Sequence, residues 1–446
     1  MQLTIILINK YLQYMKTKLF LMCFFLFQFT NAQNITFTDP ILKEFLVGAQ
    51  INFSQDYNVV TTYPPIDANN DGEINTIEAL NVIGLDFYYL NITDLEGLQY
   101  FTNLKVINSY FANFPSFSQP SLVNLEQLSL INSVGSTTLS NINIANNINL
   151  VKLQCSSDLI TSLDLSNNIL LRNVDIYCPS LTTVNFNNLV NLKSLRFLGK
   201  LPTIDISDAV NLLNLTCVGS SDSFTYPLYN RLTSLNLDNQ TKLINLDLTG
   251  NNISSLDLSN CTNLESISIS NNIISTLNIT NVDYVKNFFC EGNLLSSLDL
   301  NSMFNLKNLI CKNNLLINLS TKNDIIEEYI DFSGNPNLSS ICCDAEEVVY
   351  MQNQCFQNNN DTVIVDSNCG GGSFKIAMYP NPVKDSLTFE TNTNVSKVEI
   401  FSTNGLLVMK DETGSETIDM NSLKSGMYFI RVQSSKGVAT MKFIKI

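Results

Sequence analysis

Apolar residues return every 21 positions through the middle of the chain. An Asn and a second Leu keep the same spacing, so three series of residues stay in step over successive units. The pattern runs from Val82 to Ile341 and predicts about 11–12 copies of one short structural unit. The series are Leu246, Ile267, Phe288, Leu309 and Ile330; Leu256, Leu277, Leu298 and Leu319; and Asn251, Asn272, Asn293, Asn314 and Asn335.

The unit reads L-x-x-L-x-(L/C)-x-x-N-x-L-x-x-L-D-L-x-x-N-x-x. Alternation of apolar and polar residues predicts a short strand whose alternate side chains face inward. Asn residues at the bends can bond the backbone there. One unit cannot bury its apolar face alone, whereas stacked units share a continuous core. The sequence therefore predicts a parallel solenoid with strands ~4.8 Å apart.

This unit resembles the leucine-rich repeat in its short bacterial form, in which two half-units of similar pattern are nested. The resemblance implies an α/β-type to mainly β solenoid over residues 82–341, with an outward sheet that can bind other macromolecules. Cys155, Cys217, Cys290 and Cys311 take the inward sixth position of the unit, as small buried apolar residues. Two insertions, at residues 133–141 and 220–230, interrupt the period and predict surface loops that are candidate contact points.

Residues 374–446 have a different pattern. Alternating strands are separated by Asn-Gly and Ser-Gly turns, which predicts a small C-terminal β-sandwich domain. The segment resembles the C-terminal sorting domain of the type IX secretion system of Bacteroidota. The residues that carry this resemblance are Tyr379, Pro380, Asn381, Pro382, Asn404, Gly405, Leu423, Gly426, Met427, Tyr428 and the terminal 442–445.

The sorting-domain resemblance implies passage through the periplasm, contact of residues 374–446 with the secretion machinery, and delivery to the outer cell surface or the medium. The first residues agree with export. A basic start from Met15, the apolar run Leu19–Phe27 and the small residue Ala32 predict a signal peptide over residues 1–32, with translation starting at Met15. The apolar run is too short to cross a bilayer, which needs ~20 such residues. The mature protein is expected to have no transmembrane segment.

A calcium-loop pattern precedes the first repeat, within an N-terminal cap at residues 33–81. Residues 67–78 match D-x-[DN]-x-[DN]-G-x5-E at every specified position. The expected Ca²⁺ ligands are Asp67, Asn69, Asp71, the Glu73 carbonyl and Glu78, with Asn75 acting through water. We predict no helix before Asp67, because two prolines interrupt "TTYPPI". One loop with one following helix favours a structural calcium cap over a switch; a solvated acidic turn is the alternative.

Cysteines cluster after the last repeat, in residues 342–373. Cys342, Cys343, Cys355 and Cys369 are disulfide candidates, because an even group in an exported protein is typical of a bridged cap. The sequence does not fix their connectivity. A metal site is the less favoured alternative, since two C-x2-C pairs are absent. The glycines at 370–372 predict a flexible linker to the tail.

Composition narrows the function classes. A net charge of −15 argues against a nucleic-acid partner, which needs clustered Lys and Arg. The chain has no His, which excludes Ser-His-Asp and Cys-His catalysis and His-ligated zinc. A row of carboxylates, Asp164, Asp205, Asp257 and Asp299, allows a hydrolase as a remote alternative. The row recurs because the repeat recurs, so we do not expect an enzyme.

The favoured function is non-catalytic binding or adhesion to a protein or a surface polysaccharide. A spacer or anchor in a surface complex, without a ligand of its own, is the alternative. Binding residues are expected among the outward positions of the repeats, where exposed aromatic, Arg and large apolar side chains are the types enriched at hot spots. The candidates are Tyr177, Arg196, Leu198, Phe289, Ile310 and Tyr329. Phe289 and Ile310 are expected side by side in one outward row, which Tyr329 extends and which Arg196 and Leu198 flank several turns earlier.

Overall fold

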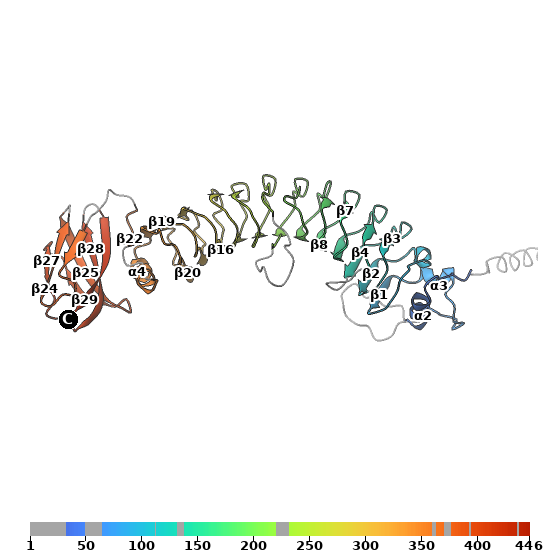
Figure 1. The fold of residues 1–446 in the computed structure, drawn as a ribbon, viewed down its shortest axis with the longest axis horizontal. Coiled ribbons are helices and arrows are strands. Elements are labelled where there is room, and N and C mark those ends of the chain that lie inside the picture. Colours follow the sequence, from blue (N-terminus) through green and yellow to red (C-terminus); the bar gives the residue numbers. More distant parts are fainter. Residues whose placement is uncertain are drawn as a thin grey trace, which may run out of the picture. The chain divides into compact units, whose positions relative to one another are not determined.

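The structure is a computed structural model that describes residues 33–49, 65–111, 113–131, 138–219, 232–358, 363–369, 376–391, 394–434 and 437–446. The predicted signal peptide, the insertion at 220–230, most of that at 133–141 and the glycine linker lie outside the described residues. The chain divides into two compact units, residues 1–159 and 160–446. Figure 1 shows the element order along the chain.

The first unit opens with a helical cap. Helix α2 (Pro40–Gly48) begins at Asp39, whose Oδ1 accepts hydrogen bonds from the backbone N–H of Ile41 and Leu42. The prediction of no helix before Asp67 is therefore wrong: an Asp N-cap followed by Pro at the first helical position starts one. The short α3 (Thr76–Leu80) follows residues 67–75, and a 3₁₀ turn, η1 (Leu98–Tyr100), follows the first strand.

Two parallel ladders make up the repeats in the first unit. The wider ladder has the order β1-β2-β4-β6, and β3 pairs with β5 in the narrower one. Inward side chains such as Leu85, Ile107, Leu128 and Leu153 are buried, so the core lies between the two ladders. The strands are β1 (Gly84–Tyr88), β2 (Val106–Tyr110), β3 (Ser116–Ser118), β4 (Gln127–Ile131), β5 (Asn141–Asn143) and β6 (Lys152–Ser156).

The same two ladders occupy most of the second unit. The wider one is β8 (Asn173–Tyr177), β10 (Ser194–Leu198), β11 (Asn214–Thr216), β12 (Asn245–Asp247), β14 (Ser266–Ser268), β16 (Asn287–Phe289), β18 (Asn308–Ile310) and β20 (Tyr329–Asp331). The narrower one has three parts: β7 (Ser162–Asp164) with β9 (Thr183–Asn185); β13 (Ser255–Asp257) with β15 (Thr276–Asn278); and β17 (Ser297–Asp299), β19 (Asn318–Thr321), β21 (Ser340–Cys343) and β22 (Ile364–Asp366). The predicted mainly β, parallel solenoid with 21-residue repeats is confirmed.

Buried asparagines join successive turns. The Asn293 Oδ1 accepts from the Ile274 N–H at 2.9 Å, and its Nδ2 donates to the carbonyls of Ile269 and Cys290, each at 3.0 Å. The other members of the series make the equivalent bonds one repeat away. Each side chain satisfies backbone groups that the bend leaves without ladder partners. The Asn period is thus a requirement of the turn.

A disulfide and a helix close the last repeats. Cys342, in β21, is bonded to Cys369, while Cys343, the last residue of that strand, is buried. Helix α4 (Val348–Gln357) carries Cys355, also buried. The expectation that Cys343 and Cys355 join disulfides is not met, because both side chains face the core of the cap while Cys342 faces the outside of its strand.

The tail has its own core between two antiparallel sheets. One sheet has the order β23-β24-β27 and the other β26-β25-β28-β29. Leu387, Phe389, Ile400, Ile430 and Phe443 are buried between them. The prediction of a small C-terminal β-sandwich is confirmed. The strands are β23 (Ile376–Tyr379), β24 (Ser386–Thr391), β25 (Val395–Ser402), β26 (Leu407–Asp411), β27 (Thr417–Asp419), β28 (Gly426–Ser434) and β29 (Gly437–Lys445).

Candidate functional site: the outward rows of the wide ladder

Parallel register sorts the outward side chains of the second unit into rows. Phe289 lies beside Ile310 on adjacent strands, and Ile310 lies beside Asp331. Arg196 belongs to the same row, separated from Phe289 by Thr216, Asp247 and Ser268. Strand neighbours in register are about 4.8 Å apart, so Phe289 and Ile310 form a continuous apolar strip. Both side chains are half-buried, whereas Arg196 is exposed.

Tyr329 lies in a different row. It pairs with Asn308, two residues before Ile310, and Asn308 pairs with Asn287. The apolar strip therefore ends at Asp331, and the expectation that Tyr329 belongs with Phe289 and Ile310 is wrong. Tyr329 is exposed at the edge of this asparagine row.

Charged residues border the apolar strip on one side and at one end. The Lys312 Nζ lies 3.2 Å from a Glu291 carboxylate oxygen and 3.6 Å from one of Asp331. The Glu291 carboxylate beside it raises the pKa of Lys312. An apolar centre with a charged rim is the usual make-up of a protein-binding surface.

Tyr177 and Leu198 are neighbours on β8 and β10, at the outward position two residues after Asp175 and Arg196. Both are half-buried. Together with Arg196 they form a second group several strands from Phe289. Of the six binding candidates, the register brings together Phe289 with Ile310 and Tyr177 with Leu198.

The first unit carries an aromatic cluster that the sequence analysis missed. Tyr88 stacks on Tyr110, and Tyr89 stacks on Phe111, one turn apart. The signal was present as "YY" at 88–89 and "YF" at 110–111, 22 residues apart. The 21-residue pattern predicts the inward residues, whereas Tyr88 and Tyr110 end their strands on the outward side and Tyr89 and Phe111 follow them.

The predicted calcium loop has a backbone turn of the required form. Gly72 has φ +78°, a conformation that suits Gly, and the Asn75 side chain caps α3. Asp67 accepts hydrogen bonds from the N–H groups of Asp71 and Gly72, at 3.1 and 2.9 Å. Glu78 reaches back to the N–H groups of Ala68 and Asn75, each at 2.9 Å.

The carboxylates of this loop do not converge on one point. Across the residues that the structure describes, no three His, Cys, Asp or Glu side chains are grouped to hold a metal ion. The Glu73 side chain, at the position whose carbonyl is a predicted ligand, is ion-paired with Lys43 at 2.6 Å. The backbone turn fits a calcium loop, whereas the carboxylate of Glu78 would have to leave its N–H donors to become a ligand.

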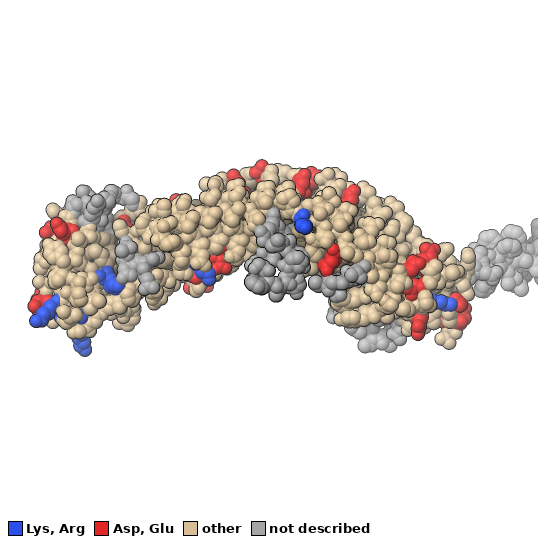
Figure 2. Space-filling view, in the orientation of Figure 1, with Lys and Arg blue, Asp and Glu red and all other residues tan. Residues whose placement is uncertain are grey.

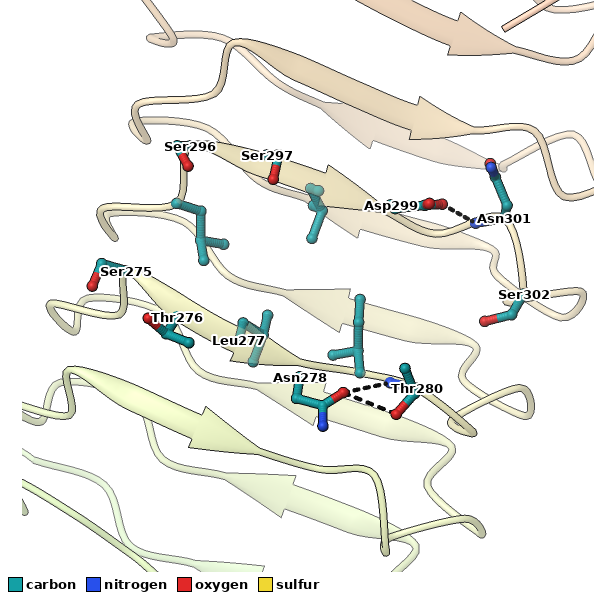
Figure 3. Close-up of a pocket in the computed structure, with 13 residues that line it drawn as sticks. Ser275, Thr276, Leu277, Asn278, Thr280, Ser296, Ser297, Asp299, Asn301 and Ser302 are labelled. Carbon is teal, nitrogen blue, oxygen red and sulfur yellow. Dashed lines mark hydrogen bonds between the residues drawn. The ribbon is translucent and has the colours of Figure 1, made fainter. Parts of the chain in front are cut away.

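A shallow groove of about 530 Å³ separates β15 from β17 in the narrow ladder (Figure 3). These two strands belong to different sheets. Leu277 and Ile279 are therefore half-buried, while Leu256 and Leu258, one repeat earlier, are buried. Asp299 is the one carboxylate among the lining residues, and it accepts the N–H of Asn301 at 3.1 Å. The groove is lined mainly by hydroxyl, amide and aliphatic groups.

The carboxylate row considered for catalysis has a structural role. Asp164, Asp205 and Asp257 each accept the N–H of the Ser two residues later. Hydrogen bonds from Ser166, Ser207 and Ser259 hold the pKa of these carboxyls below the usual range. A general acid needs a raised pKa, so the shift has the wrong direction for that role. These side chains close the turn after each narrow strand.

The inward thiols are also structural. Burial raises the pKa of Cys261 to about 12, and burial likewise raises the pKa values of Cys217, Cys290 and Cys311. Thiolate is the reactive form, so these groups are inert. In the C-terminal cap, burial and the adjacent Glu327 carboxyl raise the pKa of Glu347 to about 9.

One family model matches the chain. It is described as "Secretion system C-terminal sorting domain" and covers residues 377–446. The sandwich at the end of the chain is therefore similar to sorting domains that direct secretion. No curated protein matches the sequence.

A solved structure shares the fold of the repeats. The functional domain of InlJ from Listeria monocytogenes, described as including a cysteine ladder, is 18% identical, with a TM-score of 0.50 over 84% of this chain and 93% of that one. A leucine-rich repeat protein of Leptospira interrogans is 17% identical, with a TM-score of 0.44 over 68% and 87% of the two chains. The repeats thus have the fold of a leucine-rich-repeat-type solenoid, and residues 377–446 match a secretion sorting domain. Within the described residues, no helix has the length and apolar character needed to span a bilayer.

Proposed function

We propose that this protein is a non-catalytic binding protein of the cell surface or medium, exported by a type IX secretion system of the Bacteroidota kind. The observation that supports binding is the apolar strip of Phe289 and Ile310 within an outward row of polar side chains. Burying both side chains under a partner favours association by a few kcal/mol, at roughly 25 cal/mol per Å². The charged rim of Glu291, Lys312 and Asp331 favours a protein partner over an uncharged polysaccharide.

The double substitution Phe289→Ser and Ile310→Ser tests the strip. We expect the melting temperature to change little, because neither side chain faces the buried core formed by Phe288 and Leu309. Capture of the natural partner by cells or immobilised protein should weaken at least tenfold, which corresponds to about 1.4 kcal/mol. Ser266→Ala with Ser268→Ala, on the adjacent strand β14, is the matched control. Unchanged capture would move the binding site elsewhere or favour a spacer role.

We also propose that residues 67–78 bind Ca²⁺ as a structural clip of the N-terminal cap. The turn at Gly72 and the Asn75 cap support this proposal. Asp67, Asp71 and Glu78 supply carboxylate oxygens, Asn69 an amide oxygen and Glu73 a backbone carbonyl, which are the ligand types that Ca²⁺ prefers. The bound ion would draw the carboxylates of the loop together, offset their negative charge and tie the loop to α3.

Calcium should raise the stability of the first unit, and Asp71→Ala should remove most of this gain. A hundredfold excess of Ca²⁺ over its Kd stabilises a folded state by about 2.7 kcal/mol. Asp71 is an exposed residue, so its loss should matter little in a chelator. Glu96→Ala, another exposed carboxylate of the same unit, is the control. The measurement is the thermal unfolding midpoint with Ca²⁺ and with a chelator. Equal midpoints for the wild-type protein in both conditions would rule out the clip.

A further inference from the structure

The first unit presents four aromatic side chains as two stacked pairs, and each pair joins residues of two adjacent turns. The ring centroids of Tyr88 and Tyr110 are 4.7 Å apart with planes 5° from parallel, and those of Tyr89 and Phe111 are 4.8 Å apart with planes at 21°. Tyr88 and Tyr89 remain 51% and 77% exposed. We call Tyr88, Tyr89, Tyr110 and Phe111 the aromatic platform.

Strand register builds the platform. Tyr88 and Tyr110 are the last residues of β1 and β2 and pair directly. The chain then turns, with Tyr89 at φ 53° and Phe111 at φ 61°, and the Tyr89 N–H donates to the Tyr110 carbonyl at 3.0 Å. Positive φ is uncommon for bulky residues, yet two successive repeats adopt it with an aromatic side chain. The arrangement forms two stacked ring pairs at consecutive positions, where a repeat needs only its inward residues for stability.

The polar neighbour of the platform is a carboxylate. Asp86 lies two residues before Tyr88 on β1 and accepts one hydrogen bond, from the Asn108 Nδ2 at 2.8 Å. Asp86 is half-buried, and this burial raises its pKa. In the structure's described residues, none of the ion pairs involves Asp86. A partly desolvated carboxylate of this kind is best neutralised by a cation.

The charged residues around the aromatic platform are mostly acidic, as Asp86 is. The basic residues in the described part of the first unit are Lys43, Lys105 and Lys152, and the first two are already paired with Glu73 and Glu126. Figure 2 shows acidic side chains gathered over the part formed by α2 and α3. The negative field and the electron-rich ring faces therefore attract the same kind of group.

We propose that the aromatic platform and Asp86 bind arginine side chains of a basic protein segment. A guanidinium group can lie flat on an exposed Tyr ring and also donate two hydrogen bonds to a carboxylate, whereas Lys offers a point charge. An uncharged polysaccharide would use the rings but would leave the carboxylate unneutralised. This inference deepens the proposed binding function and rests on it, but it places a second contact area far along the sequence from Phe289.

The test is fluorescence anisotropy of a labelled arginine-rich peptide with the full chain in about 0.1 M salt. The same peptide with citrulline in place of arginine keeps the shape of the side chain and removes its charge. We expect binding of the arginine peptide and at least tenfold weaker binding of the citrulline peptide. Tyr88→Ser with Tyr89→Ser should weaken arginine-peptide binding roughly tenfold. Asp86→Asn should weaken it severalfold and reduce its dependence on salt.

The matched control is Tyr284→Ser with Tyr350→Ser, two exposed tyrosines of the second unit, which should leave binding unchanged. If loss of the Tyr88 stack unfolds the cap, Tyr89→Ser alone tests the platform through its most exposed ring. Three results would each overturn the inference. The control variant could lose as much arginine-peptide binding as the Tyr88/Tyr89 variant, or the citrulline peptide could bind as tightly as the arginine peptide. The wild-type protein could also bind a neutral oligosaccharide tightly and the Tyr88/Tyr89 variant lose that binding. A natural partner that the Tyr88/Tyr89 variant still captures fully would also overturn it, while leaving the proposed binding function intact. A wild-type chain that captures no protein at all would overturn the binding function itself.

Discussion

Deletion of residues 374–446 is expected to abolish export across the outer membrane and leave a folded solenoid in the periplasm. The tail has its own core, in which Val383, Leu387, Ile400 and Phe443 are fully buried, so its removal exposes no interior of the repeats. The tail contacts the cap along β29, which lies beside β22 and α4. There the Arg431 Nη2 donates to the Ala345 carbonyl at 2.7 Å, and the Lys442 Nζ lies 3.9 Å from the ring centroid of Phe356. The truncated protein should therefore fold normally but no longer be exported.

Cell fractionation measures this result, with circular dichroism of the truncated protein as the check on folding. Arg431→Ala is the control, because it removes the bond to Ala345 and leaves the sandwich core intact, and it should be exported normally. Truncated protein in the medium in normal amounts would contradict the sorting role. Truncated protein that is degraded or misfolded would show that the cap needs the tail for stability.

The fold was predictable because the repeat imposes the same physical demand at each turn. Leu246, Ile267, Phe288 and Leu309 are all buried, so the spacing of the inward residues specifies both the strand and its neighbour. The same spacing also places Asp331, rather than Tyr329, after Ile310. The error at Tyr329 therefore came from a slip of two residues, which exchanges one outward row for another.

The two caps at the ends of the repeats were less predictable, because their sequence signals occur once and no repetition confirms them. Helix α2 had a usable signal, Asp39 before Pro40, but it is short and stands alone. The bond between Cys342 and Cys369 required three-dimensional proximity, which four cysteines in a sequence do not specify. The outward residues were the hardest case. Their side chains do not stabilise the repeat, so the period that locates Phe289 or Tyr88 cannot tell a binding surface from a solvated one.

Asn293→Ala is expected to destabilise the solenoid more than a typical surface substitution, by about 3 kcal/mol. The side chain is buried and bonds the Ile274 N–H and the carbonyls of Ile269 and Cys290. Alanine leaves these groups without a partner in a place that water reaches poorly, so the cost is that of unsatisfied backbone groups as well as the lost bonds.

Asn263→Ala is the control that separates the cost of unsatisfied buried backbone groups from a general preference for Asn in the turns. The exposed Asn263 donates one hydrogen bond, to the Thr241 carbonyl at 2.7 Å, and water can replace it. We expect a loss below about 1 kcal/mol for this variant. The measurement is the denaturant midpoint of both variants, with strand content followed by circular dichroism. Stacked repeats are coupled to their neighbours, so Asn293→Ala should also broaden the transition by weakening one interface within the stack. Equal midpoints for the two variants would mean that the Asn series marks the bends without holding them, and that the stability of the stack resides in its apolar core alone.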